Sequence, residues 1–417
     1  MIDFLLIAKT FLQFDHRNQY FFDLLKLAPK SPKIYVGMSG GVDSSVVALI
    51  LKSIGFDPIG LFMKNWEDDG ICTSAQDAQD VESVCAQLNI PFFSLNFVEE
   101  YQKKVFSYFL EDLKNGLTPN PDMLCNREIK FQCFLKEALE LNADFLATGH
   151  YAGLTPKQSH QQYPFQLSKA VDLTKDQSYF LAEVDPKVWK NVLFPLMYLK
   201  KSQVRLLAEM SNLVVSKKKD STGICFVGER NFTDFLQKYI SESKGSFVDL
   251  DGNQKGPHNG HFNYTIGQRK GLGIGGPGEP WFVAGKNILT NDVLVVQGEN
   301  HPALFYHDFS IHVPHWQIEA AEIESLWQEV QADLVDKDLI YKINCLVKIR
   351  YRQEDIPCEL IKKFNHDSSR FDYIVSFPEA IRAPTPGQYA VFYLNQQVIA
   401  CAVISELGHS NWAKSCK

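Results

Sequence analysis

The chain has 417 residues, 45% of them hydrophobic and 22% charged, which predicts two or three folded domains and excludes a disordered, collagen-like or coiled-coil chain. No run of 18 apolar residues occurs, so we expect no membrane-spanning helix and no membrane partner. The 42 basic and 49 acidic side chains give a net charge of −7, so a nucleic-acid partner requires a local basic face, because a general positive field is absent.

The first 33 residues precede the first predicted strand. Their apolar run at 4–8 lacks the basic start and the long apolar core of a signal peptide. Asp3, Asp15 and Asp23 argue against a mitochondrial transit peptide. Residues 21–27 favour a short amphipathic helix. We therefore expect 1–33 to be a loosely packed N-terminal extension.

Residues 34–228 alternate between predicted strands and predicted helices. Strands are expected at 34–38, 59–63, 92–97 and 144–148. Helices are expected from Asp43 onward, at 78–88, and around 101–114 and 127–141. Such alternation predicts an α/β domain with a Rossmann-like parallel sheet that is covered on both faces.

The pattern changes after about residue 225. Residues 245–280 are rich in Gly, Pro, Asn and His, which predicts a small, turn-rich central module within 229–300. From 301 to 417 the pattern indicates strands, including an alternating run at 345–352 and a hairpin of 389–394 with 398–404. A closed or nearly closed C-terminal β-barrel would hide the edges of such short strands.

The most specific local signal follows the first strand, where Ser39-Gly40-Gly41-Val42-Asp43-Ser44 opens a helix. Two glycines allow a close backbone approach, and the unpaired N–H groups of the helix start favour an anion. Asp43 is suited to holding Mg²⁺ that is bound to phosphate oxygens. The loop has no lysine and is not the G-x-x-x-x-G-K-[ST] phosphate loop. The plainer alternative is an ordinary strand-turn-helix corner.

This loop resembles the pyrophosphate loop of the N-type ATP pyrophosphatases, which cleave ATP between its α and β phosphates and adenylate an oxygen of the substrate. Further motifs narrow the resemblance. They are Gly60-Leu61-Phe62-Met63, Thr118-Pro119-Asn120-Pro121-Asp122, Leu124-Cys125-Asn126, Gly149-His150-Tyr151, Lys175-Asp176-Gln177, Gly223-Ile224-Cys225-Phe226, Ile266-Gly267-Gln268-Arg269, Arg350-Tyr351-Arg352 and Pro386-Gly387-Gln388. Their order is similar to that of the bacterial tRNA 2-thiouridylases over roughly residues 34–405.

The resemblance implies ATP and Mg²⁺ as cofactors and 2-thiolation of the wobble uridine of tRNA as the reaction. Adenylation converts the C2 oxygen into a leaving group, and delivering sulfur to that carbon requires a persulfide and a second thiol. By resemblance, Cys225 carries the persulfide and Cys125 is the nucleophile that resolves it as a Cys125–Cys225 disulfide. Asp122 is the expected general acid or base.

Two sets of binding residues follow from the same resemblance. The expected nucleotide site comprises Gly37, Met38, Ser39, Gly40, Gly41, Val42, Asp43, Ser44, Met63 and Gly149. The expected tRNA contacts are Asn120, Pro121, Asp122, His150, Lys175, Asp176, Gln177, Arg350, Tyr351 and Gln388. For Met63, nucleotide contact and core packing stay open. For the run at 217–219, RNA contact and a solvated charged face stay open.

The remaining cysteines are expected to be small buried hydrophobes. They are Cys72, Cys85, Cys133, Cys345, Cys358, Cys401 and Cys416. The absence of any C-x-x-C pair argues against a zinc site or an iron–sulfur cluster, so no protein-bound metal site is predicted. Sulfur is then expected from a persulfide relay protein, in a reducing cytoplasm.

Two alternatives stay open. One is another ATP pyrophosphatase, a synthetase that activates a small amide or carboxylate substrate. This alternative accounts for the loop at 39–44. It does not account for Cys125 and Cys225, each of which lies within a motif, or for the C-terminal β-domain. The other is a catalytically silent RNA-binding module on an ATP-binding fold. The substrates that the resemblance implies are the Lys, Glu and Gln tRNA isoacceptors.

Overall fold

A computed structural model describes residues 2–19, 32–67, 74–157, 162–220, 232–241, 243–330 and 339–410. The described residues fall into two compact units. The first is drawn from 1–106, 121–230 and 396–398, and the second from 107–120, 231–395 and 399–417. Over these described ranges, none of the helices combines the length and the apolar character needed to cross a bilayer.

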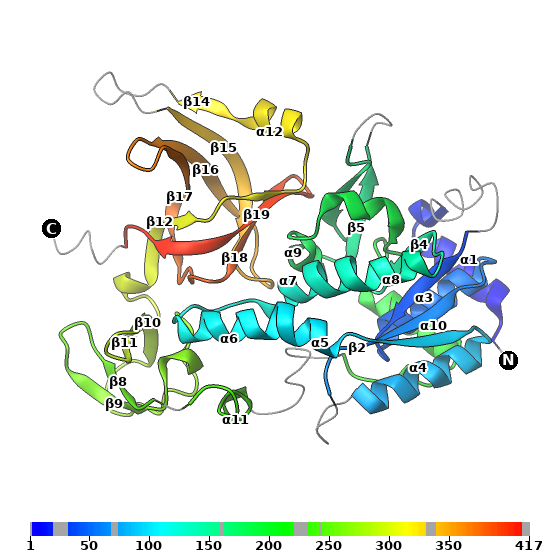
Figure 1. Cartoon of the computed structure of the whole chain (residues 1–417), viewed down its shortest axis with the longest axis horizontal. Coiled ribbons are helices and arrows are strands. Elements are labelled where there is room, and N and C mark those ends of the chain that lie inside the picture. Colours follow the sequence, from blue (N-terminus) through cyan, green and yellow to red (C-terminus); the bar gives the residue numbers. More distant parts are fainter. Residues whose placement is uncertain are drawn as a thin grey trace. The chain divides into compact units, whose positions relative to one another are not determined.

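The first unit is built on a five-stranded parallel sheet, as the alternating pattern predicted (Figure 1). The strand order is β3-β2-β1-β4-β7. All four predicted strands are present within one residue at each end, and β7 is an additional short edge strand. The strands are β1 (Ile34–Met38), β2 (Ile59–Lys64), β3 (Phe92–Asn96), β4 (Phe145–Thr148) and β7 (Val192–Leu193).

The direction of winding reverses at β1. Helix α3 (Val42–Ser53) leads from β1 to β2, and α4 (Ser74–Leu88) leads from β2 to β3. The chain then returns to the other side of β1 to form β4. Right-handed crossovers place α3 and α4 on one face and the return helices on the other. The carboxyl ends of β1 and β4 therefore border the crevice where open α/β sheets bind ligands.

The return connection contains several short helices. Those of the first unit are α5 (Val98–Tyr101), the π-helical η2 (Gln102–Phe106), α7 (Pro121–Leu124), the π-helical η3 (Cys125–Phe134) and α8 (Leu135–Glu140). Between η2 and α7 the chain passes into the second unit, where it forms α6 (Ser107–Lys114). The predicted helices around 101–114 and 127–141 thus exist, but they are divided by π-helical turns.

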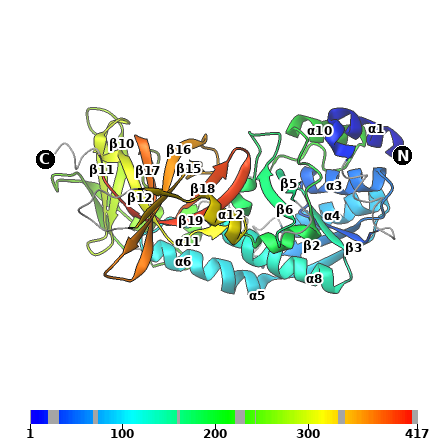
Figure 2. The same ribbon diagram turned by 90° about the horizontal axis from the view of Figure 1, so that it is seen from above.

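The N-terminal segment is packed more closely than we expected. Helix α1 (Phe4–Phe14) lies against α3 and α10 (Lys201–Met210), as Figure 2 shows. Ile7 and Phe11 are buried, and Phe11 is 0% exposed. The apolar run thus forms one face of an amphipathic helix that covers α3. The helix expected at 21–27 lies outside the described residues.

A hairpin that the sequence analysis did not identify extends the first unit. Strands β5 (Ala152–Pro156) and β6 (Phe165–Lys169) pair in antiparallel fashion, and Ser168 of β6 also pairs with Gln397. Helices α9 (Ser178–Leu181) and η4 (Pro186–Asn191) follow before β7. Because β5 begins directly after the 149–151 motif, the hairpin carries the chain away from the crevice and back to the 175–177 motif.

The second unit contains a small four-stranded sheet and a barrel. The sheet has the order β10-β11-β8-β9. Its core includes Phe247, Leu272 and Val283. Its strands are β8 (Gly245–Val248), β9 (Gln254–His258), β10 (Trp281–Asn287) and β11 (Asp292–Gln297). The turn-rich stretch predicted at 245–280 supplies β8, β9 and the irregular chain before β10.

The C-terminal barrel is closed, because its six antiparallel strands run in the order β12-β17-β16-β15-β18-β19 and β19 pairs again with β12. This confirms the predicted β-barrel, including the hairpin of β18 and β19 around Asn395. The strands are β12 (Phe305–Ile311), β15 (Ile340–Lys348), β16 (Ile356–Asn365), β17 (Arg370–Arg382), β18 (Tyr389–Leu394) and β19 (Gln397–Leu407).

Two details of the barrel bear on the predicted residues. Strand β15 ends at Lys348, so Arg350 and Arg352 lie on a turn and the expected strand position is wrong. The turn is stabilised because Gln353 N–H donates to the carbonyl of Arg350. Cys345 and Cys358 face each other across β15 and β16 in the barrel core, with their Sγ atoms 3.6 Å apart.

Most of the other described cysteines match the expectation of buried hydrophobes. Cys85 and Cys401 are buried, and burial raises the pKa of the Cys85 thiol to about 11. Cys133 is the exception, since it is only partly buried and lies 3.5 Å from the Lys104 ammonium. Cys72 and Cys416 lie outside the described residues.

Candidate active site

The predicted phosphate loop joins β1 to α3 at the crevice. Gly40 has a φ of +74°, and a Cβ there would lie 2.7 Å from the carbonyl oxygen of Asp77 in α4. The Ser44 hydroxyl accepts a hydrogen bond from Ser39 N–H at 3.1 Å, which closes the loop on the first turn of α3. Gly41 is the N-cap residue and has no side chain to occupy the helix start. The arrangement leaves the first N–H groups of α3 available to an anion.

Gly149 brings the end of β4 against this loop. A Cβ at position 149 would lie 2.8 Å from Ser44 N and 3.1 Å from the carbonyl carbon of Asp43. Gly37 of β1 pairs with Thr148 of β4, so the two strand ends are in register. Glycine at 149 thus allows the end of β4 to lie directly against the start of α3, where the Cβ of any larger residue would clash with the backbone of the loop.

Asp43 contacts Lys201, which belongs to none of the sequence motifs, and Tyr151, which belongs to the 149–151 motif but had no predicted role. The Lys201 ammonium lies 2.7 and 2.8 Å from its two carboxylate oxygens, and the Tyr151 hydroxyl donates to Oδ1 at 2.8 Å. Lys201 and Tyr151 therefore hold the Asp43 carboxylate at the first turn of α3. Among the described residues no cluster of three or more His, Cys, Asp and Glu side chains forms a metal site. One carboxylate together with phosphate oxygens is nevertheless a usual Mg²⁺ environment.

Asp220 collects three cations next to the same loop. Lys175, Lys201 and Arg205 lie 2.8, 2.9 and 2.6 Å from its carboxylate oxygens. Burial by itself would raise the pKa of Asp220, but hydrogen bonds from Lys175 and Lys201 hold that pKa well below its usual range. Lys201 therefore bridges Asp43 and Asp220. Lys175, Lys201 and Arg205 thus share the Asp220 carboxylate beside the phosphate loop.

Lys218 adds a further cation to the loop. Its ammonium donates to the carbonyl of Gly40 at 3.0 Å and lies 2.7 Å from Asp77 and 2.6 Å from Asp80. Its neighbours Lys217 and Lys219 are exposed. Lys218 is thus turned to the phosphate loop, whereas Lys217 and Lys219 match the solvated charged face. RNA contact by this run stays a prediction.

Asp122 and Cys125 lie one helical turn apart, on α7 and at the start of η3, so their side chains share a face. Burial raises the pKa of the Asp122 carboxyl, and the nearby charge of Lys130 partly opposes that shift. Cys125 is 1% exposed. The next residue, Asn126, donates to the carbonyl of Phe180 at 3.1 Å, which ties this helix to the 175–181 segment.

His150 lies near Lys130 and packs against aromatic rings. Its Nδ1 is 2.8 Å from the Thr148 hydroxyl, and its Nε2 is 3.5 Å from the Lys130 ammonium. The ring contacts Phe131 and Phe194. Burial and the charge of Lys130 lower the pKa of His150 well below its ordinary value, so the ring is neutral at physiological pH. Neutral His150 can exchange hydrogen bonds with a base but adds no positive charge.

Hydrogen bonds within the first unit hold the 175–177 motif in place. Asp176 is 3% exposed, and its carboxylate accepts from Ala170 N–H at 3.0 Å and from the Ser178 hydroxyl at 2.8 Å. Gln177 forms two hydrogen bonds with Tyr151, one through its side-chain oxygen and one through its backbone N–H. Lys175 contacts Asp220 as described above. In this conformation the side chains of Asp176 and Gln177 stabilise the backbone of residues 175–178 through these hydrogen bonds.

The remaining predicted residues are placed as follows. Met63 is partly exposed at the end of β2, whereas Met38 and Val42 are buried and Pro121 is buried at the start of α7. Asn120, Arg350, Tyr351 and Gln388 belong to the second unit. The Gln388 amide donates to the carbonyls of Thr118 and Pro119, and Arg350 donates to Ala383. Cys225 lies outside the described residues.

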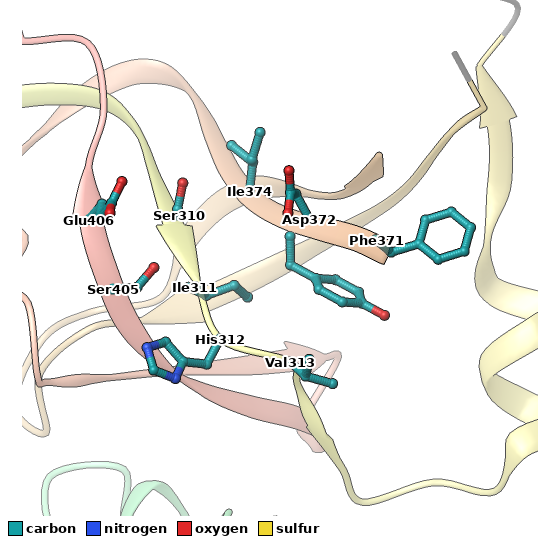
Figure 3. Close-up of a pocket in the computed structure, with 10 residues that line it drawn as sticks. Ser310, Ile311, His312, Val313, Phe371, Asp372, Ile374, Ser405 and Glu406 are labelled. Carbon is teal, nitrogen blue, oxygen red and sulfur yellow. The ribbon is translucent and has the colours of Figure 1, made fainter. Parts of the chain in front are cut away.

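Lys130 and Lys201 were not identified from the sequence, and Tyr151 was identified only as a member of the 149–151 motif. Lys201 stands 158 residues from Asp43, so no local pattern connects them. One signal did exist, because Lys200 and Lys201 begin α10, where a positive charge is unfavourable to the helix dipole. The second unit also has a pocket of about 480 Å³ beside His312, Asp372 and Glu406 (Figure 3), and it is lined by none of the predicted site residues.

Comparisons with known proteins agree with this organisation. Residues 32–229 match the family model described as the tRNA methyl transferase HUP domain. Residues 233–297 match the tRNA methyl transferase PRC-barrel domain, and 317–404 match the aminomethyltransferase beta-barrel domain. The NMN synthetase of Francisella tularensis aligns with a TM-score of 0.34 and 18% identity over 55% of this chain and 81% of that chain, which is too weak to bear on function.

The parallel sheet, the glycine loop and the HUP match define an ATP-using enzyme. The tRNA-specific 2-thiouridylase MnmA of Staphylococcus epidermidis is 45% identical over 384 residues, which cover 91% of this chain and 97% of that protein. The protein of the same name from Staphylococcus aureus has the same identity and coverage. This chain belongs to the MnmA family of tRNA-specific 2-thiouridylases.

Proposed function

We propose that this chain catalyses the ATP-dependent 2-thiolation of the wobble uridine of tRNA. Its 45% identity to the staphylococcal tRNA-specific 2-thiouridylases over nearly their whole length is the observation that carries this conclusion. The phosphate loop at the crevice of an ATP-using fold and the Asp122–Cys125 pair on one helix face support it.

ATP is proposed to bind with its phosphates at the start of α3, beside Gly149. The exposed N–H groups of the loop and the ammonium of Lys201 are suited to the negative phosphate oxygens. Mg²⁺ is proposed to take Asp43 as its protein ligand. Because Lys201 now neutralises Asp43, a divalent cation at that carboxylate would release Lys201 to the phosphates. Met63 and Met38 are proposed to border the nucleotide.

The first chemical step joins the uracil C2 oxygen to the α phosphorus of ATP and expels pyrophosphate. The terminal sulfur of a Cys225 persulfide then attacks C2, and AMP leaves with the oxygen. The Cys125 thiolate next attacks the inner sulfur of Cys225. This forms the Cys125–Cys225 disulfide and leaves the electron pair on the sulfur of the thiolated base. A thiol reductant must reduce the disulfide before another turnover.

Asp122 is proposed as the acid or base for the uracil N3 proton. Its raised pKa is suited to this task, since a carboxyl poised nearer neutral pH can both accept and return a proton. The charge of Lys130 acts on Asp122, and its ammonium lies 3.5 Å from His150 Nε2. The base must leave the anticodon stack to reach these groups.

The proposed tRNA contacts are those predicted from the sequence. They are Asn120, Pro121, Asp122, His150, Lys175, Asp176, Gln177, Arg350, Tyr351 and Gln388. We propose the Lys, Glu and Gln isoacceptors as substrates, a persulfide relay protein as sulfur donor, and the cytoplasm as the compartment. The domain boundaries are proposed as 34–228, 229–300 and 301–417, and the ranges of the three family models support them.

The deciding experiment incubates purified protein with ATP, Mg²⁺, tRNA and a cysteine desulfurase relay, and measures 2-thiouridine by nucleoside mass spectrometry. Cys125→Ser and Cys225→Ser are each expected to abolish thiolation and to keep tRNA affinity, whereas Cys133→Ser serves as the matched control and keeps activity. Pyrophosphate release without any thiolated nucleoside would favour another ATP pyrophosphatase. RNA binding without pyrophosphate release would indicate a silent RNA-binding module.

A further inference from the structure

The closed barrel of the second unit places two cysteines directly opposite each other on neighbouring strands. Strands β15 and β16 run antiparallel and side by side (Figure 1), and Cys345 of β15 is the register partner of Cys358 of β16. Their Sγ atoms lie 3.6 Å apart. No step of the proposed thiolation uses either thiol, so the pair is a cluster of two reactive groups without an assigned role.

The backbone around Cys345 and Cys358 has the geometry that a disulfide requires. Directly opposed residues of an antiparallel pair have Cα atoms about 4.5 or 5.5 Å apart, depending on whether the pair exchanges backbone hydrogen bonds. Both values lie within the range of about 4.4–6.8 Å that disulfides span. Rotation of the two side chains can therefore bring the sulfurs into bonding contact while β15 and β16 keep their register.

The surroundings of the two thiols decide which oxidant can reach them. Cys345 is 8% exposed and Cys358 is 5% exposed, and both belong to the apolar core of the barrel. A second protein or a bulky charged reagent cannot enter this core, whereas a small uncharged oxidant such as hydrogen peroxide can. A thiol that is oxidised there has the other thiol as an immediate neighbour, and such a resolving cysteine favours a disulfide over further oxidation.

The proton on Cys358 controls how fast such a reaction runs. The hydrogen bond with Cys345, together with burial, raises the pKa of the Cys358 thiol well above its ordinary value, and the charge of Glu359 acts in the same direction. Because the thiolate is the species that reacts with oxidants, the pair should react slowly near neutral pH. It therefore stays reduced in a reducing compartment, as the sequence analysis expected.

The pair lies at the base of the connection that joins β15 to β16. This connection comprises residues 349–355, and at its two ends the Lys348 ammonium lies 4.0 Å from the Asp355 carboxylate. The connection carries Arg350 and Tyr351, two of the predicted tRNA contacts. A covalent link between the two cysteines would hold both ends of the connection together and restrict its motion.

We propose that Cys345 and Cys358 form a reversible disulfide when hydrogen peroxide oxidises the protein, and that this disulfide fixes the connection at 349–355. One thiol attacks a peroxide oxygen, which forms a sulfenic acid and releases one water molecule. The second thiol attacks the sulfenic sulfur and releases another water molecule. The two sulfurs together lose two electrons, which the peroxide gains, and a dithiol reductant reverses the step. The proposal concerns the barrel alone and does not depend on the proposed function.

The test treats the full-length protein with hydrogen peroxide, denatures it, alkylates the remaining thiols and digests it with trypsin without reduction. Trypsin cuts after Lys348 and Arg352, so the two cysteines fall in separate peptides, 343–348 and 353–362. We expect mass spectrometry to find these peptides joined, with two hydrogen atoms fewer than their sum, and dithiothreitol to separate them. Hydrogen exchange of residues 349–355 should slow by about tenfold in the oxidised protein.

Three variants provide the controls. Cys345→Ala and Cys358→Ala should each lose the joined peptides and the slower exchange. Cys401→Ala removes a fully buried cysteine of β19 outside the pair and should behave as wild type. Thermal unfolding checks that each variant is folded.

Two results would overturn the proposal. After peroxide treatment, the two peptides could be recovered apart, with each cysteine alkylated or oxidised to a sulfonic acid, which would show that the thiols do not pair. Joined peptides with unchanged exchange at 349–355 would show that the disulfide does not fix the connection. Both results are independent of whether the protein thiolates tRNA.

Discussion

The ammonium of Lys201 lies between the carboxylates of Asp43 and Asp220, within 2.9 Å of each. The Lys201 ammonium thus links Asp43, in the first turn of α3, to Asp220. The Lys201 side chain is 13% exposed, so the pair is not an ordinary surface ion pair. Added phosphate groups would compete with both acids for this ammonium.

Lys201→Met is expected to weaken ATP binding by about tenfold or more, because a charge-assisted hydrogen bond contributes about 1.5–3 kcal/mol. Isothermal titration with ATP and Mg²⁺ measures the change. The exposed neighbour Lys200 provides a matched control, and Lys200→Met should bind ATP as wild type does. Equal ATP affinities of the two variants would remove Lys201 from the nucleotide site.

Gly149→Ala places a methyl group 2.8 Å from Ser44 N and close to the Asp43 backbone. Either β4 or the phosphate loop must shift, at a cost of about 1–3 kcal/mol in the free energy of unfolding. We expect ATP binding to fall further than stability does, because the shifted loop carries the N–H groups that are proposed to bind the phosphates. The same substitution at Gly275, which has open space around it, is the control. Wild-type ATP affinity in Gly149→Ala would contradict the proposed location of the phosphates.

Asp122→Asn should lower the thiolation rate by about 10²-fold or more, because it removes the proposed acid or base. In the wild type, activity that depends on the Asp122 carboxylate should fall as the pH drops through its raised pKa, above the ordinary value of 3.8. The pH–rate profile of Asp122→Asn should lack this decrease of activity at acidic pH, which is the acidic limb of the wild-type profile. Because a raised carboxyl pKa destabilises the folded protein above pH 3.8, Asp122→Asn should be at least as stable as wild type at neutral pH. A rate profile with an unchanged acidic limb would contradict the assignment.

Asp220→Asn tests the three-cation cluster through stability. The folded pKa of Asp220 is lowered, so its contribution to the free energy of unfolding is present above pH 3.8 and is lost as the pH falls through the folded pKa. The variant should be less stable than wild type at neutral pH, and the difference should shrink in acid. Urea unfolding at a series of pH values measures it. A difference that does not depend on pH would show that the ion pairs do not account for the effect.

Phe11→Ala tests the packing of the N-terminal helix. Phe11 is fully buried in α1, so its truncation should lower the free energy of unfolding of the first unit by about 3–5 kcal/mol. Leu5→Ala is the control, since Leu5 is 65% exposed and should cost no more than about 0.5 kcal/mol. Similar midpoints of thermal unfolding for both variants would mean that α1 does not stabilise the fold.

The amino-acid sequence determined the local elements and the class of fold. Strands β1 to β4, the helix that begins after the glycine loop, and the hairpin at Asn395 each depend on the periodicity of neighbouring residues, and the structure confirms them. The phosphate loop was also recognisable from the sequence alone, since its glycines and hydroxyl side chains lie within six consecutive positions. The prediction of the strand at 34–38 and of the loop at 39–44 therefore did not depend on residues far away in the sequence.

Only the tertiary structure decided which distant side chains complete the site. Lys201 reaches Asp43 across 158 residues, and Gln388 reaches Thr118 across 270. A long-range ion pair or hydrogen bond leaves no spacing pattern in the sequence, because its two partners meet through the packing of whole elements. For the same reason Arg350 was expected on a strand, whereas it lies on the turn that follows β15 and holds the carbonyl of Ala383. Local periodicity predicts where a chain is extended or helical, and the packed fold decides which groups become neighbours.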